Sequence, residues 1–297
     1  MRNVPAVAVV VGWALLGAVG IGRAKESGEE PQTAARLSGQ SSTEVNKNVT
    51  DPVSTTWSLK LENVVNFLDI DGHGSPVEDE VKFQPTLPVL LTPGLKIIAR
   101  PEFTLLDSKP FTSHGELERT TAVGDTIFDL VLSPVVRPWL FALGSTFVFP
   151  TANLDETGQG KWQAGPAGVV GYRTREWVAT AIAQQWWSFA GPASRAPVTE
   201  LHLQYIASYF FGDGWSVGTD PTLKVDWRAT PGNQVTFPIG PNVAKVVKLA
   251  DAVPVKFQLD ALYVPVTPEK GPQCIIEVKI TPVIPALLPG PLLTAHD

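Results

Sequence analysis

The sequence has 297 residues, of which 44% are hydrophobic and 18% are charged, with a mean hydropathy of +0.08. This balance excludes an intrinsically disordered protein and falls short of a helical membrane protein, which needs repeated apolar runs of about 20 residues. The net charge of -6 provides no basic surface for nucleic acid, so we expect no nucleic-acid partner. The 25 glycines, 27 prolines and 9 tryptophans favour many short strands, and the single cysteine excludes an internal disulfide framework.

Residues 1–24 have the pattern of a secretory signal peptide. Arg2 precedes an apolar run that ends in Gly22-Arg23-Ala24, where small residues occupy the third and first positions before a cleavage site. The alternative is a membrane anchor, but Pro5 and several glycines weaken the run. We therefore expect cleavage after Ala24 and export of the mature chain.

Residues 25–51 are rich in Ser, Thr, Glu, Gln and Asn and contain few large apolar side chains. Such a segment buries too little surface to offset the entropy lost on ordering it. We interpret it as a flexible polar leader. Residues 52–285 are expected to form one β domain, followed by a C-terminal tail at residues 286–297 that is rich in Pro and Leu.

Beyond the leader, segments of roughly 10 to 14 residues alternate in polarity or are apolar throughout, with Gly, Pro, Asp and Asn clusters between them. In one segment Leu95, Ile97 and Ala99 alternate with Lys96 and Arg100, which puts the two sets on opposite faces of a strand. The pattern predicts about twelve strands. They lie at residues 55–67, 80–91, 94–107, 125–136, 138–150, 161–173, 176–189, 199–211, 214–227, 234–248, 254–265 and 274–284.

Alternation fits either a soluble β-sandwich or an outer-membrane barrel. The barrel is favoured by strands that suit a tilted crossing of about 9 to 11 residues, by the export signal and by tryptophans placed where indole rings meet membrane interfaces. Prolines such as Pro88, Pro101, Pro221 and Pro241 argue against the barrel, because a closed sheet has no edge for a missing N–H. In a barrel, some of them must mark bulges, strand ends or extensions beyond the bilayer. We predict an all-β, antiparallel transmembrane β-barrel. Each tryptophan in or beside these strands could lie at a membrane interface or, alternatively, in the core or in a cross-strand aromatic pair. These residues are Trp57, Trp139, Trp162, Trp177, Trp186, Trp187, Trp215 and Trp227.

Several motifs resemble a known family in their order and spacing. They are Phe83-Gln84-Pro85-Thr86-Leu87-Pro88, Gly160-Lys161-Trp162-Gln163-Ala164-Gly165-Pro166, Gln184-Gln185-Trp186-Trp187-Ser188-Phe189-Ala190-Gly191 and Gly212-Asp213-Gly214-Trp215. Across roughly residues 51–285, the sequence is similar to the bacterial family named for the MetA-pathway of phenol degradation. The resemblance implies an outer-membrane barrel that admits small, often hydrophobic or aromatic compounds, and it implies no catalytic residues. The tail departs from the pattern because it lacks the terminal aromatic residue common in outer-membrane barrels.

The sequence contains no pattern typical of an enzyme or a metal protein, so we expect no catalytic residues, no cofactor and no metal. No nucleophile elbow, Walker loop, CxxC pair or dinucleotide fingerprint occurs. Residues 69–80 nearly match a calcium loop, but His73 occupies position five and no helical pattern flanks it, which favours an acidic hairpin loop. Cys274 is expected to be a small apolar filler. The histidines lack metal-binding spacing: His73, His114, His202 and His296.

In a barrel, the polar face of each strand borders the lumen. About twelve strands lie between the eight-stranded barrel, which side chains fill, and the 16-stranded porin with its open channel, so a narrow bore is expected. Loops 69–80, 107–123 and 151–160 are expected to cap it. The candidate lumen-lining residues are Lys60, Glu62, Lys96, Arg100, Glu102, Glu200, His202, Gln204, Lys256, Gln258 and Asp260.

These features together favour a passive channel in the bacterial outer membrane for small molecules, including hydrophobic or aromatic compounds, with membrane lipid around it. Two alternatives remain open: a structural barrel that transports nothing, and a secreted soluble β-protein that binds a ligand. Channel activity in reconstituted bilayers separates the first alternative from transport. Recovery of the protein in the soluble fraction would favour the second alternative.

Overall fold

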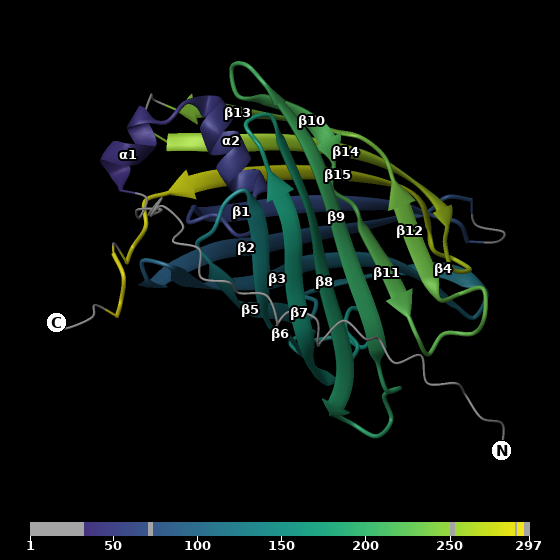
Figure 1. Cartoon of the computed structure of the whole chain (residues 1–297). Helices are drawn as coiled ribbons and strands as arrows, with labels where there is room; N and C mark the ends of the chain where they lie inside the picture. The colour runs from purple at the N-terminus through teal and green to yellow at the C-terminus, as the bar shows by residue number, and fades with distance from the viewer. Residues whose placement is uncertain (1–32, 71–73, 250–252, 289, 294–297) are drawn as a thin grey trace.

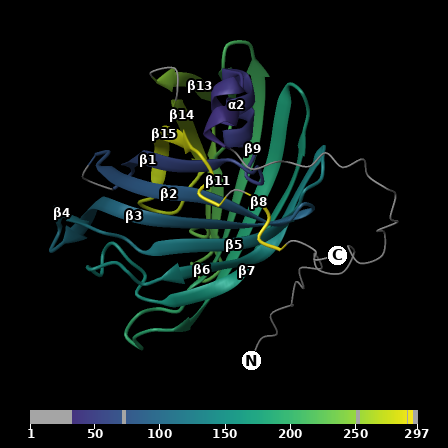
Figure 2. The same ribbon diagram turned by 90° about the vertical axis from the view of Figure 1, so that its left-hand side faces the viewer.

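The structure is a computed structural model that describes residues 33–70, 74–249, 253–288 and 290–293. A single antiparallel sheet closes on itself, with two short helices at one end (Figures 1 and 2). The expected signal peptide lies outside the described residues. No helix in this described part of the chain is long and apolar enough to span a bilayer.

Most of the ring is built from strands that pair one after another in sequence order. These strands are β1 (Trp57–Leu68), β2 (Val77–Thr92), β3 (Leu95–Ser113), β5 (Thr126–Pro134), β6 (Trp139–Phe149), β7 (Trp162–Arg173), β8 (Trp177–Ala190) and β9 (Thr199–Phe211). The first strand, β1, also pairs with the last, β15 (Pro272–Ile284), and β15 pairs with β14 (Val253–Val266). Pairing of the first and last strands removes both edges of the sheet.

Each of the two remaining positions in the ring consists of two short strands. β10 (Trp215–Thr219) and β11 (Thr222–Asp226) both pair with β9, and Asp220-Pro221 separates them. β12 (Val235–Ile239) and β13 (Asn242–Leu249) both pair with β14, and Gly240-Pro241 separates them. Pairing of β13 with β10 and of β12 with β11 completes a closed barrel of 12 strands.

The predicted strands and the barrel are confirmed, with two of the twelve segments divided at a proline. Pro221 and Pro241 lie between strands, where a missing N–H interrupts no ladder, while Pro88 and Pro101 lie within β2 and β3. The expected loop at residues 107–123 is wrong, because β3 continues to Ser113 and pairs with β4 (Glu116–Ala122). This hairpin projects from the barrel (Figure 2). Its turn residues His114 and Gly115 have positive φ angles of 52° and 84°, as a tight two-residue hairpin requires.

The outer face of the barrel is apolar and is bordered by aromatic side chains at both ends. Leu143 and Val170 lie between the borders and are 72% and 51% exposed. We call the end at which the chain enters and leaves the barrel the terminal end, and the opposite end the loop end. Lipid explains an apolar belt between aromatic girdles, whereas a soluble sandwich would carry charge there. Exposed tryptophans mark the terminal end (Trp139, Trp177 and Trp215) and the loop end (Trp162, Trp187 and Trp227).

Two of the eight tryptophans in or beside the strands are buried, so for them the alternative of a buried position holds and the interfacial one does not. Trp57 is 5% exposed and donates a hydrogen bond from its indole N–H to the carbonyl of Pro88, at 2.7 Å. Trp186 is 1% exposed, points inward and donates to the hydroxyl of Thr146, at 3.0 Å. The indole N–H of each buried ring has a hydrogen-bond partner, as is usual for buried tryptophans.

Residues 33–51 differ from the expected flexible leader, because they fold against the terminal end of the barrel. They form α1 (Ala34–Gly39) and α2 (Ser42–Thr50), shown in purple in Figure 1. The side chain of Ser41 caps α2 by accepting a hydrogen bond from the backbone N–H of Glu44. Leu37 and Val45 are buried against Val246 and Val283 of the barrel. The barrel therefore supplies the apolar partner that the segment lacks by itself.

Two glycines of β7 provide a matched test of how closely neighbouring strands approach. A Cβ atom on Gly165 would lie 1.8 Å from the carbonyl oxygen of Gln185, whereas one on Gly168 would lie 3.7 Å from its nearest neighbour, the carbonyl of Ala142. Closed barrels commonly resist SDS until heated, because every backbone group is paired. We expect Gly165→Ala to lower the temperature at which the gel mobility shifts and Gly168→Ala to leave it unchanged. Equal shifts in the two variants would contradict the packing described here.

Candidate functional site in the lumen of the barrel

The terminal half of the lumen is filled by apolar side chains. Ile98, Leu140, Val178 and Phe210 point inward and pack around Val53, which follows α2. We call residues 33–51 the N-terminal segment. Burial of this apolar cluster stabilises the position of the segment inside the ring. Sequence reasoning missed the cluster because residues 126–134 and 139–149 are apolar on both faces, so alternation did not mark an inner side.

Polar contacts also hold the N-terminal segment in the terminal half of the lumen. The side-chain amide of Asn46 donates to the carbonyl of Gly214 and to the hydroxyl of Ser216, both at 3.0 Å. The carboxylate of Asp51 lies 2.7 Å from the guanidinium of Arg137 and 3.1 Å from that of Arg173. These contacts reach different strands of the ring, so the segment closes the terminal end from several sides.

The loop half of the lumen contains a cavity of about 560 Å³, and a smaller cavity of about 90 Å³ lies between it and the N-terminal segment. The exposed side chain of Glu156 lines the larger cavity, which therefore reaches the surface at the loop end. Lys60, Arg100 and Lys279 line both cavities and form part of the layer that separates them. A path that enters the lumen at the loop end thus meets this charged layer first and the N-terminal segment next.

Most of the lumen residues predicted from the sequence lie along these two cavities. Lys96 and Asp260 are exceptions, since they are 2% and 0% exposed and line neither cavity. Contact of the predicted set with a solute remains a prediction. The residues that line the larger cavity are Lys60, Glu62, Arg100, Glu102, Glu200, His202 and Gln204, and those that line the smaller one include Lys256 and Gln258.

Sequence reasoning missed the acidic and basic side chains of β2 and of the outer part of β3. Glu78, Glu80 and Lys82 line the larger cavity, and their spacing of two residues was the signal that could have identified them. On β3, a bulge at Leu105 shifts the register of pairing with β2. A bulge reverses the alternation of faces, so Asp107 borders the lumen although its parity in the sequence assigned it to the outside.

One lysine lies at the centre of the charged layer. The ammonium nitrogen of Lys279 is 2.7 Å from Glu277, 2.9 Å from Asp220, 3.3 Å from Asp260 and 3.5 Å from Glu62. The side chain of Lys279 is 6% exposed, so water screens these interactions weakly. One cation thus compensates carboxylates from four separate segments of the chain.

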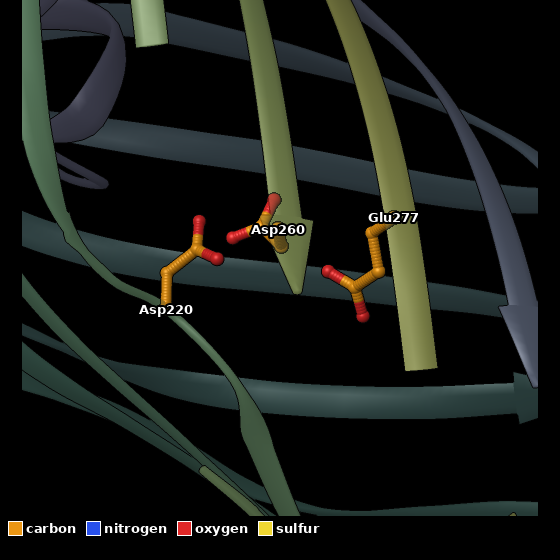
Figure 3. Close-up of side chains that lie close together, drawn as sticks. All are labelled: Asp220, Asp260 and Glu277. Atoms are coloured by element: carbon orange, nitrogen blue, oxygen red, sulfur yellow. The ribbon is translucent and has the colours of Figure 1, made fainter. Parts of the chain in front are cut away.

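Three of these carboxylates form the group best placed to hold a metal ion among the described residues. Oxygen atoms of Asp220, Asp260 and Glu277 all lie within 4.8 Å of one another, and Figure 3 shows the three side chains converging from separate segments. Lys279 contacts each of them, and the amide of Gln258 donates to Asp220 and Asp260. The ammonium and the amide supply the positive partners, so the group has the chemistry of an ion-pair network.

The predicted capping role can be followed for the connection at residues 151–160, which turns into the loop end of the lumen. The carboxylate of Asp125 accepts hydrogen bonds from the backbone N–H groups of Ala152, at 3.1 Å, and Gln159, at 2.8 Å. From the other side, Arg195 donates to the carbonyl of Gln159, at 3.1 Å. Residues 156–159 line the larger cavity and narrow it.

The segment at residues 69–80, which resembled a calcium loop, is only partly described. Glu80 belongs to β2 and pairs with Lys82 at 2.6 Å, while residues 71–73 lie outside the described residues.

The fold is similar to that of a solved outer-membrane channel. The COG4313 outer membrane channel from Pseudomonas putida F1 superposes with a TM-score of 0.55 and 13% identity over 77% of this chain and 96% of that chain. A BenF-like porin from Pseudomonas fluorescens Pf-5, with a TM-score of 0.25 and 8% identity over 77% of this chain and 98% of that chain, is too distant to support an argument. No protein-family model and no curated protein matches the sequence. The first likeness supports the fold of an outer-membrane barrel.

Removal of the central cation should destabilise the barrel, because Lys279→Met leaves several buried carboxylates without their partner. Breaking a buried ion pair in this way costs about 3–5 kcal/mol. We expect a large fall in the temperature of the gel-mobility shift. The control is Lys245→Met, since Lys245 pairs at 3.0 Å with Asp213, whose side chain is 85% exposed, and such surface pairs contribute about 0–1 kcal/mol. The measurement is made in the presence of a chelator, so that no metal ion replaces the lysine among the carboxylates. A Lys279→Met variant that is as stable as the wild type under these conditions would contradict this role of the lysine.

Proposed function

We propose that the protein is a passive channel of the bacterial outer membrane that admits small molecules, and that it performs no catalysis. The observation that carries this proposal is the cavity of about 560 Å³ inside a closed barrel whose outer face suits lipid. The cavity reaches the surface at the loop end and ends at the charged layer, beyond which lie the smaller cavity and the N-terminal segment. A solute that enters at the loop end would therefore meet the charged layer first and the N-terminal segment next.

The resemblance of the motifs to the family of the MetA-pathway of phenol degradation supports small compounds, including hydrophobic or aromatic ones, as the class of solute. The lumen-lining residues predicted from the sequence are proposed to border its path. The polar side chains of the charged layer, such as Lys60, Arg100 and Gln204, would contact polar groups of the solute. In this arrangement the N-terminal segment at residues 33–51 lies on the periplasmic side, because short connections are typical of that side of such barrels.

A variant that removes the contact between Asp51 and the two arginines provides a direct test of the channel. We expect Asp51→Ala to loosen the N-terminal segment, because this variant removes the buried carboxylate that joins the end of α2 to Arg137 and Arg173, although Arg173 keeps its contacts with Glu44 and Asn48. Loosening of the segment should raise the single-channel conductance of the full-length protein in planar bilayers. The control is Glu176→Ala, which removes an exposed carboxylate at the same end of the barrel. No conductance in the wild type and in Asp51→Ala would refute transport and favour a structural barrel.

Export by a cleaved signal peptide is part of the proposal and has its own test. Protein extracted from the outer-membrane fraction should begin at Lys25, as mass spectrometry of the intact chain would measure. The physical reason is the pair of small residues, Gly22 and Ala24, at the positions that signal peptidase recognises. A chain that retains residues 1–24 in the membrane fraction would contradict cleavage. Recovery in the soluble fraction would instead favour the ligand-binding alternative.

A further inference from the structure

The larger cavity carries an excess of negative charge. Its lining contains eleven acidic side chains and six lysines and arginines. A cavity lined by an excess of one sign, with walls of low dielectric constant, focuses its field and concentrates ions of the opposite sign. The field inside this cavity therefore favours cations.

Several of these carboxylates are satisfied by neutral donors, which leave their charge in place. Asp129 accepts a hydrogen bond from the amide of Gln184, at 2.8 Å, and Glu200 accepts one from the amide of Gln159, at 2.5 Å. Asp125 accepts its hydrogen bonds from backbone N–H groups. The excess charge is therefore not cancelled within the wall at these positions.

One carboxylate of the cavity has an unsatisfied oxygen. Asp107 is 8% exposed, and its Oδ1 atom has no hydrogen-bond partner among the described residues. The nearby lysines are engaged elsewhere, since Lys109 pairs with Glu78 at 3.1 Å and Lys82 pairs with Glu80 at 2.6 Å. A buried carboxylate oxygen without a donor is costly, because it has lost its water.

The position of Asp107 in the sheet adds to this cost. Asp107 is the cross-strand partner of Glu80, and both side chains border the cavity. Like charges directly opposite each other in an antiparallel pair are destabilising. Three carboxylates, Glu78, Glu80 and Asp107, thus share two lysines, and one negative charge remains without a partner. A cation bound between Asp107 and Glu80 would remove both costs.

We propose that this part of the cavity binds organic cations, and that Asp107 with Glu80 and Glu78 holds an ammonium or guanidinium group. The inference rests on the proposed channel and specifies the charge of its solute. A cation that enters at the loop end is drawn along the acidic wall to Asp107. The ion pair between Glu80 and Lys82 then forms the inner border of the site.

Isothermal titration of spermidine into full-length protein in detergent tests the site without requiring conductance. We expect the wild type to bind spermidine and Asp107→Asn to bind it about tenfold more weakly, which is the effect of losing one charge-assisted hydrogen bond. Asparagine has the shape of aspartate and can donate to Glu80, so this variant should resist heat at least as well as the wild type. Glu118→Gln is the control, because it removes an exposed carboxylate from β4, which lies outside the ring.

Ion selectivity in planar bilayers provides the second measurement. Under a KCl gradient, the wild-type reversal potential should indicate a preference for K⁺ over Cl⁻, and Asp107→Asn should reduce that preference while Glu118→Gln does not. Absence of spermidine binding to the wild type, or equal affinity of Asp107→Asn and Glu118→Gln for spermidine, would overturn the inference. Spermidine binding in a protein that never conducts would uphold the cation site and refute the channel.

Discussion

Every backbone N–H and C=O group of a membrane-spanning sheet has to find its partner within the sheet, because the bilayer interior offers no water. Pairing of β1 with β15 meets this requirement by closing the ring. Once the ring is closed, the two-residue period of the strands sorts side chains into a lipid face and a lumen face. The apolar belt, its aromatic borders and the polar cavity all depend on that closure.

A ring of 12 strands is wider than one that its own side chains fill, so other segments occupy part of the lumen. At the terminal end, the segment at residues 33–51 and Val53 pack against inward-facing apolar side chains. At the loop end, residues 156–159 narrow the cavity. Between the two, Lys279 compensates the carboxylates around it. The interior therefore changes from apolar to charged along the barrel axis.

The strands could be predicted because each signal is local. Alternation in 94–107, for example, predicted that Arg100 and Glu102 share a face, and both line the cavity. The errors have a common cause in long-range contacts. Asp107 changed sides because of a bulge at Leu105, and β4 formed by pairing with the extended part of β3. A local pattern does not record a partner that lies far along the chain.

The sequence by itself determined the class of fold, because polarity with a period of two, strand lengths and turn residues are properties of neighbouring residues. It also indicated which alternating strands carry polar side chains on one face. Only the tertiary structure decided that α2 occupies the terminal end, since Asn46 and Asp51 acquire their partners from β10, the turn before β6 and the end of β7. It also decided that Asp107 lies opposite Glu80, because that contact exists only when β2 and β3 are paired around the bulge.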